Sequence, residues 1–105
     1  MALQKVSDAE FDQLLQSHDK VVVKYYADWC GSCRLIAPKY TKLAESADSS
    51  ILFLDVNAEE SPTARRAAGV TNLPFFAVFK KGELAEGVNT SRIELLEELI
   101  QNHLN

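Results

Sequence analysis

ADWCGSCRLIAP, at residues 27–38, contains both cysteines of the chain, Cys30 and Cys33. It follows Val21–Tyr26, a run of β-branched and aromatic residues that is typical of a buried strand. Apolar residues then recur at helical spacing from Ser32 to about Ser46, which predicts a helix. A C-x-x-C motif is a weak signal alone, but between a strand and a helix it indicates a redox-active pair.

The start of a helix favours a reactive thiolate. Cys30 is expected at or just before the first helical turn, where unpaired N–H groups and the helix dipole stabilise negative charge. The thiolate is the nucleophile in thiol chemistry. Cys33 lies one turn further on and can attack a mixed disulfide formed at Cys30. Gly31 is expected to allow a tight turn, and the small Ser32 leaves room for a protein substrate.

Two other interpretations of the cysteines stay open. One is a pair of buried, inert thiols, and the other is a zinc site. Zinc needs two further ligands, but the only histidines, His18 and His103, lie in polar segments at the ends of predicted helices. A structural disulfide closing so small a ring stabilises little, because the entropic gain grows with loop length. We therefore predict a redox pair and no metal site.

Length, charge and hydropathy limit the class of protein. The 105 residues fit one compact domain, so we expect a single domain over 1–105. The net charge of −4 disfavours a nucleic-acid partner, because phosphate binding needs basic patches. No run of about 18 apolar residues is present, so we expect no membrane association through a spanning helix. The first residues also lack an apolar stretch of signal-peptide length, and a cytoplasmic protein is expected.

Strand and helix patterns alternate along the chain in the order β-α-β-α-β-α-β-β-α. This order predicts an α/β fold with a central mixed sheet of four to five strands and helices on both faces. Helix starts are marked by S-x-x-E boxes and by a serine followed by proline. The expected elements are a short edge strand Leu3–Val6, a helix from Ser7 to about Ser17, the strand Val21–Tyr26, the helix from Ser32 that contains Pro38, a strand Ile51–Val56, a helix from Ser61 to Gly69, a strand Phe75–Phe79, a hairpin at Lys81-Gly82 into Leu84–Ala85, and a helix after Ser91 with a capping box at Ser91–Glu94.

Residues 27–38 resemble the thioredoxin family, whose pattern here is A-x-W-C-G-P-C-K followed by I-A-P. A second match is GVTNLPF at residues 69–75, followed by FKKG at residues 79–82. The resemblance covers nearly the whole chain, and two motifs at the right separation are specific. It implies the thioredoxin fold and thiol–disulfide exchange at Cys30 and Cys33, which reduces disulfides in protein substrates.

The resemblance also implies a substrate groove and a reductant. In the family, the proline at Pro74 follows a cis peptide bond and faces the cysteines, and the backbone of Leu73 helps to hold an extended substrate strand. The oxidised protein is re-reduced by a thioredoxin reductase that draws on NADPH, no cofactor is bound by the chain, and a monomer is expected. The rest of the surface would be formed by Trp29, Gly31, Ser32, Val70, Thr71 and Asn72.

Three positions depart from the family pattern. Ser32 replaces the usual proline, which stiffens the loop and favours a reducing protein. Lys24 stands six residues before Cys30, where thioredoxins carry a buried aspartate that helps to move the proton of the second cysteine. Phe53 is taken to replace the lysine that pairs with that aspartate. Loss of both partners together is coherent, because either one alone is an uncompensated buried charge.

The role of Lys24 is left with three alternatives. Its ammonium stabilises a nearby thiolate, or a buried Lys24 acts as a neutral base, or its side chain extends to the sheet edge and contacts nothing. We hypothesise that Lys24, a candidate modulator of cysteine ionisation, and Ser32 both shift the balance toward the dithiol form. The redox potential is then expected above that of an ordinary thioredoxin, about −270 mV.

Two rival functions share the fold. The first is an oxidase- or isomerase-like protein, which differs in redox potential. The second is a non-catalytic binding module that grips a partner through the groove at Pro74. The intact C-x-x-C disfavours the module, and a protein-disulfide reductase is the leading prediction.

Overall fold

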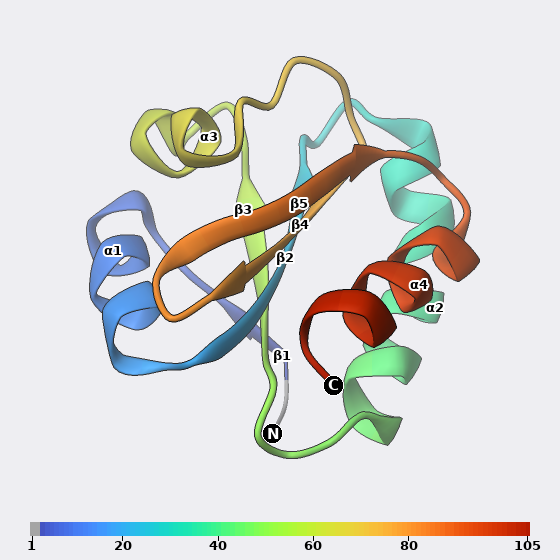
Figure 1. The fold of residues 1–105 in the computed structure, drawn as a ribbon. Coiled ribbons are helices and arrows are strands. Elements are labelled where there is room, and N and C mark those ends of the chain that lie inside the picture. Colours follow the sequence, from blue (N-terminus) through green and yellow to red (C-terminus); the bar gives the residue numbers. More distant parts are fainter. Residues whose placement is uncertain (1–2) are drawn as a thin grey trace.

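A computed structural model of the chain describes residues 3–105. Over these residues a five-stranded sheet is combined with four helices, and this confirms the predicted fold class (Figure 1). The elements are β1 Leu3–Lys5, α1 Asp8–Ser17, β2 Lys20–Tyr26, α2 Gly31–Ser46, β3 Leu52–Asn57, α3 Pro62–Ala68, β4 Phe75–Lys80, β5 Glu83–Asn89 and α4 Ile93–His103.

The sheet is mixed, with the strand order β1-β3-β2-β4-β5. β1, β3 and β2 run parallel, while β4 is antiparallel to β2 and β5 is antiparallel to β4. α2 provides the long crossover that joins the parallel strands β2 and β3. α1 and α3 cover one face of the sheet, and α2 and α4 cover the other (Figure 1).

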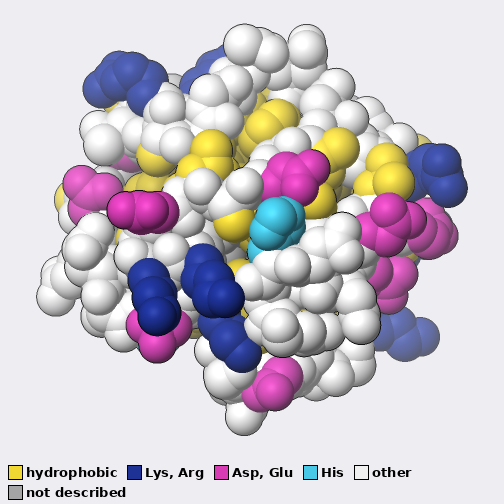
Figure 2. Space-filling model, viewed as in Figure 1, with side chains coloured by type: hydrophobic (Ala, Val, Ile, Leu, Met, Phe, Trp, Pro, Cys, Tyr) yellow, Lys and Arg dark blue, Asp and Glu magenta, His cyan; other side chains and the backbone are white. Residues whose placement is uncertain are grey.

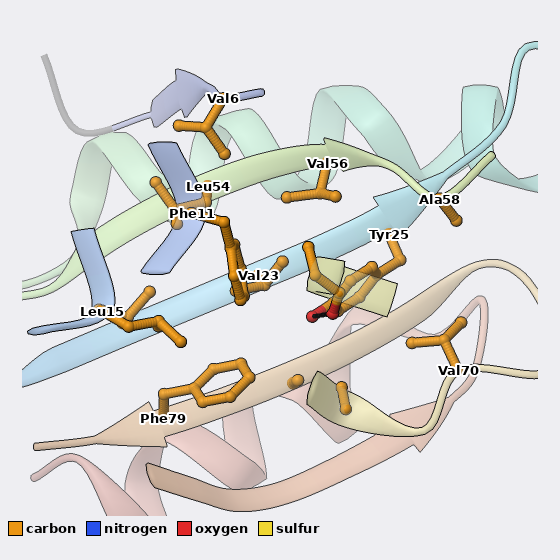
Figure 3. Packing of buried hydrophobic residues seen from close by; sticks show 14 residues of the cluster. Val6, Phe11, Leu15, Val23, Tyr25, Leu54, Val56, Ala58, Val70 and Phe79 are labelled. Atoms are coloured by element: carbon orange, nitrogen blue, oxygen red, sulfur yellow. Dashed lines mark hydrogen bonds between the residues drawn. The ribbon is translucent and has the colours of Figure 1, made fainter. Parts of the chain in front are cut away.

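The central strand β2 is buried on both faces, which explains its nearly continuous apolar sequence. Successive side chains point to opposite faces of a strand. Val23 and Tyr25 therefore pack with Phe11 under α1 and α3, as Figure 3 shows, while Val22 packs under α2 and α4. Lys24 shares the face of Val22 and is the one buried charged side chain of β2.

Helix α3 is capped from a distance. Ser61 occupies the predicted N-cap position before Pro62, but its side chain makes no capping hydrogen bond. The N–H groups of Thr63 and Ala64 instead donate to the Asp8 carboxylate at 3.1 and 2.8 Å. These bonds and the positive end of the helix favour the carboxylate, and the pKa of Asp8 is lowered, chiefly by the N–H of Ala64.

The hairpin and the last helix differ from the sequence prediction. β5 extends over Glu83–Asn89, well beyond the predicted Leu84–Ala85, because it pairs with all of β4. Lys81 and Gly82 form the turn with φ values of 53° and 82°. The predicted capping box at Ser91–Glu94 is wrong, because α4 begins one residue later than that box requires and has Arg92 at its N-cap.

Charges on the surface are mixed. On the face drawn in Figure 2, acidic and basic side chains are interspersed, and the basic ones form no continuous stripe. Among the helices of residues 3–105, none has both the length and the apolar character needed to cross a bilayer.

Candidate active site

Both cysteines lie at the N-terminus of α2. Cys30 is the N-cap residue and Cys33 is in the first turn, and the two are joined by a disulfide with their Cα atoms 5.2 Å apart. The N–H of Cys33 donates to Cys30 Sγ at 3.1 Å. The Cys30 sulfur therefore already accepts from one of the helix N–H groups that lack an intrahelical partner. This arrangement favours negative charge on Cys30 once the disulfide is reduced.

The loop around the cysteines is open on one side. Trp29 is 65% exposed, and its indole N–H donates to Glu59 Oε2 at 2.6 Å. Gly31 and Ser32 are exposed. The expected tight-turn role of Gly31 is wrong, because its φ is not positive and a Cβ there would meet nothing within 4 Å. Gly31 instead leaves free space beside the disulfide.

The second motif, residues 69–75, lies next to the disulfide in space. The Leu73–Pro74 peptide bond is cis, as the family resemblance implies. Leu73 packs against the small apolar cluster that contains both cysteines. Thr71 and Asn72 are exposed, but Val70 is 5% exposed and its side chain belongs to the core beneath α1 and α3. Val70 can therefore reach a substrate only through its backbone.

Lys24 is buried and paired, which contradicts the interpretation that it extends to the sheet edge. It is 4% exposed and stands opposite Asp55 in the register of β2 and β3. Lys24 Nζ lies 3.2 Å from Asp55 Oδ1 and 5.5 and 5.3 Å from the ring centres of Tyr26 and Tyr40. Each isolated charge here would cost several kcal/mol, and the pairing offsets that cost.

Phe53 is not the position that faces Lys24. It is opposite Val22 and packs edge-on against Tyr40 in the core, at a ring distance of 5.8 Å. Phe53 and Asp55 point to the same face of β3, two residues apart, so the sequence pattern alone left the register open. The charge pair is therefore not lost. Relative to the family pattern it is inverted, with the lysine on β2 and the aspartate on β3.

A cleft connects this ion pair to the second cysteine. It has a volume of about 270 Å³, and its lining includes Cys33, Lys24 and Asp55. Asp55 Oδ1 is buried and forms its ion pair with Lys24 Nζ, but it accepts no hydrogen bond within the described chain. Burial and then the Asp55 charge raise the pKa of both Tyr26 and Tyr40. The Tyr40 hydroxyl is thus kept neutral and donates to the Leu54 carbonyl at 2.8 Å.

The histidines stand apart from the cysteines. His18 Nδ1 contacts the Leu14 carbonyl, and His103 Nε2 contacts Glu86 at 2.8 Å. Across residues 3–105, no group of three metal-ligating side chains comes together. The sulfurs of Cys30 and Cys33 are instead bonded to each other.

Three polar residues near the site were not anticipated from the sequence. Glu59 holds Trp29, Asp55 pairs with Lys24, and Asn89 donates to the Pro74 carbonyl at 2.7 Å. Each is 15 or more positions away from its partner. No local pattern marks such residues.

Comparisons with known proteins agree with this geometry. The family model described as Thioredoxin matches residues 2–102. Thioredoxin of Staphylococcus haemolyticus is 36% identical over 105 residues, which cover 99% of this chain and all of that protein. Thioredoxin of Porphyra purpurea is 35% identical over 89 residues, 84% of this chain and 83% of that protein. The structure of spinach chloroplast thioredoxin f, short form, superposes with a TM-score of 0.91 at 28% identity, covering 99% of this chain and 95% of that one.

Proposed function

The chain belongs to the thioredoxin family and is a thiol–disulfide oxidoreductase, and we propose that it acts as a reductase of protein disulfides with Cys30 as the attacking residue. The observation that carries this proposal is the position of the disulfide at the N-terminus of α2, with Cys30 at the N-cap. Exposure does not separate the two cysteines, since Cys30 is 4% and Cys33 3% exposed. The helix geometry does, because the Cys30 sulfur accepts the N–H of Cys33.

The reaction proceeds in two exchanges. The Cys30 thiolate attacks one sulfur of a substrate disulfide, forms a mixed disulfide and releases the other substrate sulfur as a thiolate. The Cys33 thiol then loses its proton and attacks Cys30 Sγ, which closes the Cys30–Cys33 disulfide and releases the second substrate sulfur. Two electrons pass to the substrate, and the two released sulfurs take up protons.

We assign the proton of Cys33 to the Lys24–Asp55 pair. Cys33 is almost fully buried, so bulk water does not reach its thiol directly. Asp55, whose Oδ1 is ion-paired with Lys24, lines the same cleft as Cys33. The carboxylate accepts the proton through water in that cleft, while the Lys24 ammonium holds the carboxylate in place and favours negative charge nearby. Lys24 is thus a positioning residue.

Substrate binding is assigned to the surface beside the disulfide. Leu73 contacts the cysteine cluster, and Pro74 follows it through a cis bond. An extended segment on either side of the substrate disulfide would lie along this edge and contact the exposed Trp29. The other residues of the surface are Gly31, Ser32, the backbone of Val70, Thr71 and Asn72.

The partners and setting follow from the same family membership. We propose that a thioredoxin reductase supplies electrons from NADPH, that the chain binds no cofactor, and that a monomer of one domain over residues 1–105 works in the cytoplasm. The relatives are named thioredoxins, and one of them is a chloroplast protein. Rate measurements with reductase and NADPH test the electron donor, and light scattering tests the monomer.

An insulin-reduction assay with dithiothreitol tests the proposal. We expect Cys30→Ser to abolish catalysis. Reduced Cys33→Ser, freed of dithiothreitol and mixed with insulin, is expected to accumulate a mixed disulfide that is visible by mass spectrometry. Ser49→Ala, at an exposed position between α2 and β3, is the control and is expected to act like wild type. Full turnover by Cys30→Ser, or the absence of a mixed disulfide with Cys33→Ser, would show that Cys30 is not the attacking residue.

A second candidate function is favoured by the inverted ion pair, which lines the same cleft as Cys33. An oxidase- or isomerase-like protein needs a dithiol form that is stabilised relative to the disulfide, and a cation near the thiolates acts in that direction. Measurement of the redox potential separates the two functions, because an oxidase lies near −120 mV and a reductase near about −270 mV.

A further inference from the structure

Asn89 makes a contact that no redox role yet explains. It is the last residue of β5 and stands opposite Phe75 in the register with β4. Its side-chain Nδ2–H donates to the Pro74 carbonyl at 2.7 Å, and the contact is half-buried. The amide thus reaches across from β5 to the peptide group that follows the Leu73–Pro74 bond.

The segment 73–75 is held by a different contact at each residue. Leu73 packs against the cluster of Cys30 and Cys33. The Phe75 ring lies against Gly87, where an added Cβ would come within 2.6 Å of two ring carbons. Pro74 is buried and has no N–H, so its carbonyl is the only hydrogen-bonding group that it offers. The Asn89 side chain donates a hydrogen bond to this carbonyl.

We infer that Asn89 is a positioning residue for protein-disulfide substrates, because its amide holds the Pro74 carbonyl and so fixes Leu73 and Pro74 beside the Cys30–Cys33 disulfide. The inference rests on the proposed substrate surface and goes beyond it by naming the group that orders it. A buried carbonyl that loses its partner turns or draws in water, and the edge beside the cysteines then loses its fixed shape. A long peptide substrate depends on that shape, whereas a small disulfide needs only access to Cys30.

Two variants separate hydrogen bonding from packing. Asn89→Ala removes the amide, while Asn89→Asp keeps its size but replaces the donor by an acceptor. Reduced protein is mixed with insulin or with the small disulfide dithiobis(nitrobenzoate), and the remaining thiols are trapped and counted over time. Loss of one hydrogen bond corresponds to about a threefold to tenfold change in rate. We expect that fall with insulin for both variants, and an unchanged rate with the small disulfide.

The controls make the result specific. Asn102→Ala changes an exposed amide on α4 and is expected to behave like wild type in both reactions. Thr71→Asp changes the proposed substrate surface itself and is expected to slow the insulin reaction alone. If Thr71→Asp slows insulin but both Asn89 variants match wild type, the role of Asn89 is refuted and the surface stands. If Thr71→Asp does not slow the insulin reaction, the proposed substrate surface is refuted, and the role of Asn89 that rests on it falls too. Equal slowing of both disulfides by the Asn89 variants also overturns the inference, because it would show a general loss of structure.

Discussion

Replacement of Lys24 by methionine removes the positive half of the buried Lys24–Asp55 pair and leaves the Asp55 carboxylate uncompensated. With Nζ and Oδ1 3.2 Å apart, the Coulomb attraction is about 5 kcal/mol at an effective dielectric constant of about 20. The two side chains are 5% and 11% exposed, so solvent screens this attraction little. Breaking one half of such a pair costs about 3–5 kcal/mol. We therefore expect Lys24→Met to lower the free energy of unfolding by about that amount.

The measurement is urea unfolding of the oxidised protein, followed by the fluorescence of its single tryptophan and by circular dichroism. At about 4 °C or more per kcal/mol for a domain of this size, the melting temperature falls by at least roughly 12 °C. Arg92→Met is the matched control, because the Arg92–Glu94 pair is 3.8 Å apart with side chains 70% and 61% exposed. An exposed pair contributes below about 1 kcal/mol.

The double variant decides whether the cost belongs to the unpaired charge. Lys24→Met with Asp55→Leu removes both charges and fills the space with apolar groups, so it is expected to recover most of the stability that each single variant loses. A single variant that loses less than about 1 kcal/mol would refute the reasoning. So would a double variant whose loss equals the sum of the two single losses.

Three further outcomes are expected. The redox potential, measured against glutathione, lies above about −270 mV and falls in Ser32→Pro; a wild-type value at or below that figure contradicts the hypothesis for Ser32 and Lys24. The lowered pKa of Asp8 means that its caps on α3 add stability above its ordinary pKa of 3.8, and that this is lost as pH falls through the folded value. The difference in melting temperature between wild type and Asp8→Ala therefore shrinks below about pH 4, and an equal difference at pH 6 and pH 3 opposes this. Phe53→Ala costs about 3–5 kcal/mol in urea unfolding, because Phe53 is fully buried, while Leu35→Ala, at an 80% exposed position, changes little.

The elements and the redox pair could be predicted because their signals are local. The apolar run of β2 and the helical spacing after Cys33 each lie within one element, and the two cysteines are three residues apart. Gly69 ends α3 with a φ of 64°, a conformation that glycine adopts without a side-chain penalty. Such features depend on neighbours in the chain, so the sequence contains most of their physical cause.

Several of the corrections involve partners that are distant in the chain. Asp8 caps α3 from 55 and 56 positions away, and Ser61, the local candidate, does not. The partner of Lys24 depends on the register of β2 with β3. Phe53 and Asp55 point to the same face of β3, so the sequence pattern did not show which of them stands opposite Lys24. Asn89 meets Pro74 only because β5 is longer than its sequence suggested.

The inverted pair separates what the fold requires from what the chemistry requires. Coulomb attraction between two opposite charges is unchanged when they exchange places, so a lysine on β2 with an aspartate on β3 satisfies the buried face as well as the reverse order. The cysteines see a different arrangement. The positive charge is carried by β2, the strand that precedes Cys30 in the chain. The negative charge, the Asp55 carboxylate, is carried by β3, and both residues line the cleft. The stability of the fold therefore requires that both charges are present, whichever strand carries each. Only the redox chemistry of the cysteines depends on which strand carries the lysine.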